Sequence, residues 1–119
     1  SWGLQDDDIL RLLRESQAAA VQDMQARTLA EARAEAERLW IATEAALTQQ
    51  GDLLSASELA ELQTAVQGLK TLAAADDVAA ITAAAEALNH ASETFAARRM
   101  DAGIRQAFTG KTLTDFEEH

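Results

Sequence analysis

The sequence predicts an all-α fold, and three observations support this class. Proline is absent and glycine occurs only five times in 119 residues, so the residues that form the tight turns between β-strands are scarce. Hydrophobic residues make up 48% of the chain but aromatic residues only 4%, and much of the apolar content is alanine, the strongest helix former. Apolar residues also recur at three- and four-residue steps. We expect a long projecting N-terminal helix that runs into an antiparallel three-helix bundle.

The composition also limits the classes of function. A core built largely of alanine is thin, so we expect no buried active site. The chain has no cysteine, which leaves no disulfide framework or thiolate zinc site, and a cytoplasmic location is the default. A formal net charge of -10 disfavours nucleic acids and anionic membranes, and no apolar run is long enough to span a bilayer. Proteins or peptides remain as the expected partners.

One long helix is expected from Asp6 to about residue 50. Ile9, Leu12 and Leu13 form an apolar stripe near its start. The stripe fades, which leaves a bend near residues 18–22 open, and then resumes at alternating steps of three and four. The resumed stripe consists of Leu29, Ala32, Ala36, Leu39, Thr43, Ala46 and Leu47. Gly51 is expected to close the helix in the left-handed conformation.

The length of this helix predicts that part of it projects. Residues 6–50 would extend roughly 65 Å at about 1.5 Å per residue, which is more than the remaining chain can cover. An apolar stripe on the projecting part needs a partner from outside the bundle.

Two further helical segments follow. Ser55 and Glu58 have the spacing of a capping box, and the apolar positions after them are Leu59, Leu62, Val66, Leu69 and Leu72 or Ala73. Gly68 suggests a close helix crossing. Asp76 is expected to cap the next helix, whose stripe is Val78, Ile81, Ala84 or Ala85, Leu88 and Phe95, then Met100, Ile104 and Phe108. The shift between these sets predicts a change of direction or a break near residues 89–92. The helix is expected to end at Gly110.

Residues 1–119 are expected to form one unit, with projecting helices over 1–38, a helical bundle over 39–110 and a tail over 111–119.

Catalytic chemistry finds little support in the sequence. The chain has two histidines, His90 and the terminal His119, too few for a triad or a multi-histidine metal site. Glu86 and His90 are best interpreted as an ordinary solvated pair. Glu31 and Glu35 are expected to pair with Arg27, Arg33 and Arg38 on the helix surface, because the Glu-x-x-His motif of a di-iron site is absent. We expect no enzyme, metal or cofactor site in these residues.

The end of the last helix is locally basic. Arg98, Arg99, Arg105 and Lys111 are opposed only by Asp101 between residues 96 and 113. These cations can complement the negative end of a helix. Alternatively, Arg98, Arg99 and Arg105 form a docking patch for acidic groups, most simply those of the chain's own helices.

Several stretches together resemble the C-terminal part of DnaK-type heat-shock chaperones. "SWGLQDDDILRLLRES" looks like the junction between the peptide-binding β-sandwich and the first lid helix of that family. The long helix, "GDLLSASELAEL" and "DDVAAITAAAEALNHASETF" then follow the order of the family's helical lid. "FAARRMDAGIRQAFTG" is similar to the ending of the HscA branch, which serves iron–sulfur cluster assembly.

The resemblance implies that this chain is a C-terminal lid subdomain whose ATPase domain and β-sandwich lie upstream. The full-length protein would bind ATP, an iron–sulfur scaffold as client and a J-domain co-chaperone. The lid would cover the peptide site and slow client release. Ile9, Leu12 and Leu13 would dock on the sandwich.

In general chaperones of the family, the closed lid is held by an acidic residue and a histidine on the second lid helix. By the resemblance, the acidic position falls on Glu37 and the histidine position on Ile41. The chain therefore keeps half of this latch, which implies easier opening.

A self-associating helical adaptor with a coiled-coil-like seam uses the same stripe. A lid binds its own β-sandwich, whereas an adaptor forms a defined oligomer without it. At high concentration, pairing of copies through residues 6–35 is expected for the lid as well.

Overall fold

The computed structural model describes residues 5–110, and in this range the chain is helical without any β-strand. Helix α1 spans Asp6–Gln50, a 3-10 turn η1 spans Gly51–Leu53, and α2, α3 and α4 span Ala56–Ala73, Val78–Ala91 and Glu93–Gly110. The all-α prediction is confirmed. The residues before Gln5 and the tail over 111–119, which includes Lys111, lie outside the described residues.

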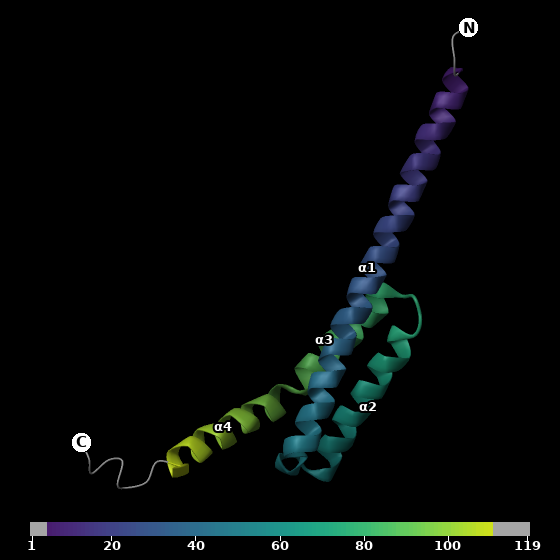
Figure 1. Ribbon diagram of the computed structural model, residues 1–119. Coiled ribbons are helices and arrows are strands. Elements are labelled where there is room, and N and C mark those ends of the chain that lie inside the picture. Colours follow the sequence, from purple (N-terminus) through teal and green to yellow (C-terminus); the bar gives the residue numbers. More distant parts are fainter. Residues whose placement is uncertain (1–4, 111–119) are drawn as a thin grey trace, which may run out of the picture.

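Helix α1 is one continuous element of 45 residues (Figure 1). It passes through residues 18–22 without interruption, because this segment contains neither proline nor glycine. Asp6, Asp7 and Asp8 occupy its first turn, where carboxylates are favourable beside the positive end of the helix dipole.

Helix α1 ends at Gln50 with Gly51 as its C-cap, as predicted, but the conformation of Gly51 differs from the prediction. Gly51 has right-handed backbone angles, φ -59° and ψ -20°, so the expected left-handed closure is wrong. The chain instead tightens into η1, where the Leu54 N–H donates to the Gly51 carbonyl oxygen over 3.1 Å. A 3-10 turn satisfies the last carbonyls of a helix without a left-handed residue.

The lower half of α1 packs against α2 and α3 to form the predicted bundle (Figure 1). From α1 only Ala36, Thr43 and Ala46 are buried, and these small side chains suit a close helix approach. The core consists of Ala36, Ala46, Leu62, Val66, Leu69, Ala73, Ile81, Leu88 and Phe95. The predicted stripe over residues 29–47 is the face of α1 that packs in the bundle. The packing begins at Leu29, earlier than residue 39, where the bundle was predicted to start.

The helix starts after η1 are fixed by side chains. At α2 the Ser55 hydroxyl accepts from the Glu58 N–H, and the Glu58 carboxylate accepts from the Ser55 N–H, so the predicted capping box is confirmed. At α3 the capping residue is Asp77, which accepts from the Ala80 N–H over 3.1 Å. The prediction of Asp76 is wrong by one residue.

Two predicted details of α1 and α2 are also corrected. Gly68 is exposed, and a Cβ added there would meet nothing within 4 Å, so it marks no close crossing. Arg33 does not form a charge pair on α1. Its guanidinium donates to the carbonyl oxygens of Ala73, over 3.0 Å, and Ala75, over 2.6 Å. Arg33 thereby caps the C-terminal end of α2 and ties it to α1.

Helix α4 leaves the bundle. α3 ends at Ala91 with Ser92 as its C-cap, which confirms the predicted break, and α4 then points away from the other helices (Figure 1). Phe95 is the one buried residue of α4, with 3% of its surface exposed. The bundle predicted over residues 39–110 therefore holds α4 only by its first turns.

Candidate docking surfaces

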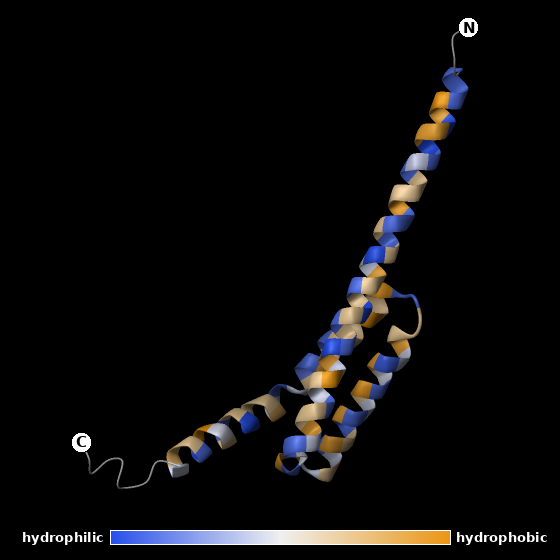
Figure 2. Ribbon diagram, in the orientation of Figure 1, coloured by the Kyte–Doolittle hydropathy of each residue, from blue (hydrophilic) through white to orange (hydrophobic). Residues whose placement is uncertain are grey.

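The N-terminal half of α1 carries exposed apolar side chains that no described part of the chain covers. Ile9, Leu12 and Leu13 are 44%, 45% and 55% exposed. Figure 2 shows apolar residues along this half of α1, which extends beyond the bundle. The full set, called here the apolar tip, is Ile9, Leu10, Leu12, Leu13, Val21 and Met24. Leu10, Val21 and Met24 were not predicted, because they fall beside the apolar stripe that Ile9, Leu12 and Leu13 form.

Three residues of the apolar tip lie on a different side of α1 from the bundle. With about 3.6 residues per turn, Ile9, Leu12 and Leu13 lie roughly half a turn around the helix from the bundle-facing Ala36 and Thr43. A partner that contacts these three residues therefore approaches from the side opposite to α2 and α3.

Glu37 and Ile41 lie on the same side of α1 as Leu12. They follow Leu12 by about seven and about eight whole helical turns, and both are exposed. The cations nearest to Glu37 in sequence are engaged elsewhere, since Arg33 caps α2 and Arg38 pairs with Glu35. Within residues 5–110, Glu37 makes no ion pair. Its carboxylate is therefore available to a partner on this side.

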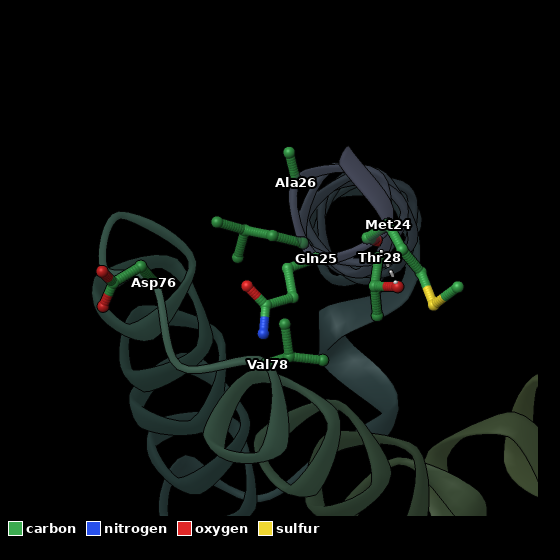
Figure 3. A pocket seen from close by; sticks show the side chains of 7 residues that line it. Met24, Gln25, Ala26, Thr28, Asp76 and Val78 are labelled. Carbon is green, nitrogen blue, oxygen red and sulfur yellow. Dashed lines mark hydrogen bonds between the residues drawn. The ribbon is translucent and has the colours of Figure 1, made fainter. Parts of the chain in front are cut away.

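A shallow groove lies where α1 leaves the bundle (Figure 3). Asp76 and Val78 form one wall, and the other wall is formed from α1 by Met24, Gln25, Ala26, Thr28 and Leu29. Gln25 and Val78 point into the space between α1 and α3, while Met24 and Thr28 lie along α1. Asp76 is its one charged lining residue, so the groove offers packing surface rather than catalytic chemistry.

The three arginines of the predicted basic patch do not act together. Arg98 donates to the Leu53 carbonyl oxygen over 2.9 Å and to the Glu58 carboxylate over 2.7 Å. Arg99 donates to the Gln50 side chain over 2.7 Å and lies over the Phe95 ring. Arg105 is exposed. No basic residue occupies the last described turn of α4, so Arg98, Arg99 and Arg105 do not act at the helix end, and Lys111 lies outside the described residues. Arg98 instead meets Glu58, an acid of the chain's own α2, as the alternative interpretation expected.

Glu58 joins the start of α2 to α4. Hydrogen bonds from the Arg98 guanidinium and the Ser55 N–H lower the pKa of Glu58 from 4.5 to about 2. The same carboxylate raises the pKa of Arg98. The Glu58 side chain therefore both caps the start of α2 and holds α4 to it.

Other chemistry is sparse in the described residues. Over residues 5–110 no cluster of three or more metal-ligating side chains occurs. The His90 Nδ1 lies 3.5 Å from Glu93 rather than beside Glu86, and both side chains are exposed. None of the four described helices combines the length and apolar character that a membrane crossing requires.

Comparison with known proteins identifies the family of this chain. The chain matches the Hsp70 protein family over residues 1–101 and therefore belongs to the Hsp70 chaperone family. A chaperone protein HscA homolog of Burkholderia pseudomallei (strain 1710b) is 51% identical over 115 residues, or 97% of this chain. HscA homologs of Verminephrobacter eiseniae (strain EF01-2) and Acidovorax ebreus (strain TPSY) are 48% and 49% identical. The predicted likeness to HscA within the DnaK-type family is confirmed. The chain spans 18% of the length of these relatives.

Glu58→Gln should lower the stability of the chain at neutral pH, and the difference from wild type should shrink as the pH falls from about 4.5 towards 2. The folded pKa is depressed, so the contribution of the carboxylate is full above the unfolded pKa and is lost on acidification. Urea unfolding across this pH range measures the difference. Glu61→Gln, on the exposed face of α2, is the matched control. A Glu58→Gln difference that stays constant with pH would contradict the role of Arg98.

Proposed function

We propose that this chain is the lid of an Hsp70-type chaperone and covers the peptide site of its β-sandwich. The observation that carries this proposal is the apolar tip of α1, which the chain's own bundle leaves exposed. Burying a fully exposed large apolar side chain contributes about 1.5–3 kcal/mol, and Ile9, Leu12 and Leu13 are about half exposed, so covering the three of them favours docking.

The geometry of α1 supports a lid rather than a general binding helix. Ile9, Leu12 and Leu13 lie on the side of α1 away from α2 and α3, so a sandwich on that side meets no steric conflict with the bundle. The rigid continuation of α1 into the bundle would move the two as one body. Such a lid changes the rate of peptide escape more than the number of peptide contacts.

The remaining roles rest on family membership. In the full-length protein we propose ATP-dependent opening and closing, a J-domain co-chaperone as partner and a cytoplasmic location. The likeness to HscA chaperones supports an iron–sulfur scaffold as the client. The lid itself would carry no catalytic step.

The alternative is a self-associating helical adaptor. The same exposed tip favours it, because an uncovered apolar stripe can serve as a seam between copies. The two proposals differ in what covers the tip.

The lid proposal predicts that this chain binds the separately prepared β-sandwich of the full-length chaperone. Leu13→Glu should weaken this binding at least about tenfold, because it places a charge in the buried contact. Titration calorimetry measures the affinity. Met100→Glu puts the same charge on an exposed apolar residue of α4 and should leave binding unchanged.

Absence of binding, together with a defined oligomer at low concentration, would reject the lid and favour the adaptor. Equal effects of Leu13→Glu and Met100→Glu would reject docking through the tip.

Glu37 is proposed to hold the closed lid by pairing with a basic residue of the sandwich. In the full-length chaperone, Glu37→Ala should speed peptide release, by a few-fold, since an exposed ion pair contributes about 0.2–1 kcal/mol. Release of a fluorescent peptide after competitor addition measures the rate. Glu35→Ala, which removes a carboxylate already paired with Arg38, is the control. An unchanged rate in Glu37→Ala would discard the latch.

A further inference from the structure

Helix α4 has an apolar side that faces away from the bundle. Met100, Ile104 and Phe108 are 69%, 49% and 65% exposed and follow one another at four-residue steps, so they form one stripe along the helix. This set is called here the outer stripe. Phe95 and Arg98, which contact the bundle, lie on roughly the opposite side.

Charged residues border one edge of the outer stripe. Asp101 and Arg105 lie on the same flank of α4 and line a shallow groove with Leu53, Arg98 and Ala102. Within residues 5–110, neither Asp101 nor Arg105 takes part in an ion pair. The flank therefore offers one carboxylate and one guanidinium beside exposed apolar surface.

We propose that the outer stripe of α4 is a self-association surface through which two copies of this chain pair, with their α4 helices antiparallel about a two-fold axis at Ile104. In a two-fold interface residue i meets j and j meets i. Met100 then lies against Phe108 of the second copy, and Ile104 lies against its own counterpart. All three apolar residues are covered in one register.

The same register pairs the charges. Asp101 precedes the axis by three residues and Arg105 follows it by one, so antiparallel pairing puts Asp101 of one copy about 3 Å along the axis from Arg105 of the other. Symmetry produces this pair twice and also puts the two Arg105 side chains about 3 Å apart along the axis, so the opposing Asp101 carboxylates are what offset the repulsion between the two guanidinium groups. Flanking charges of this kind fix the orientation and register of paired helices.

The charge distribution explains why a second copy would meet α4. Residues 6–24 carry five acids against two arginines, so pairing of two copies through the apolar tip brings like charges together. Helix α4 carries three arginines against two acids, in a chain of net charge -10. The repulsion between copies is therefore smallest at α4. A stripe of three large side chains buries little area, so the pair is weak and transient.

The proposal is independent of the lid, because it involves neither the tip nor the sandwich. It is tested in the full 119-residue chain with Leu13→Glu and Leu10→Glu added, which put charges on both sides of the apolar tip and oppose association through it. Sedimentation velocity from about 10 μM to 1 mM should show a monomer–dimer equilibrium. Ile104→Glu should abolish it, and Asp101→Arg or Arg105→Asp alone should weaken it at least about tenfold.

The decisive step mixes the two single charge variants in equal amounts. The Asp101→Arg variant carries arginine at both positions, and the Arg105→Asp variant carries aspartate at both positions. Both ion pairs are therefore restored between unlike copies. Dimer should reappear in the mixture and in the Asp101→Arg, Arg105→Asp double variant. Circular dichroism checks that each variant remains helical. A chain that stays monomeric to 1 mM, a dimer that survives Ile104→Glu, or a mixture without rescue would overturn the proposal.

Discussion

The structure depends on a mismatch between the length of α1 and the bundle that covers it. Only the part of α1 from Leu29 onward packs against α2 and α3, and its buried residues there are small. The earlier part is held as a helix by its own backbone hydrogen bonds. No other described part of the chain covers Ile9, Leu12 and Leu13 there. An uncovered apolar surface on a rigid extension is what a docking element requires.

The bundle remains well defined although its core is thin, because polar groups fix where each helix begins and ends. Arg33 caps α2 from α1, Asp77 caps α3, and Glu58 both completes a capping box and receives Arg98 from α4. The arm α4 is therefore attached through a few specific contacts rather than by extensive packing. Its first turns are fixed, and its outer side is left to interact with other molecules.

Periodicity predicted most of the fold, since apolar spacing reports directly which side of a helix is buried. It predicted the stripe over residues 29–47, the capping box at Ser55 and the break before Phe95. It failed where tertiary contacts decide. The conformation of Gly51 depends on η1, and Arg33 reaches carbonyl groups that are distant in sequence. For the candidate surfaces, sequence marked Ile9, Leu12 and Leu13 and offered an acid of the chain's own helices as a partner of the arginines. It did not identify Glu58 as that acid for Arg98, or the Gln50 side chain as the partner of Arg99.

Hydrogen exchange in a dilute monomer tests the central claim most directly, because it reports how firmly each part of α1 is held. Amides of residues 9–24, which rely on the helix alone, should exchange at least about 100-fold faster than those of residues 59–72 in the packed part of α2. Equal protection of the two segments would show that the chain itself covers the start of α1, and would contradict the account.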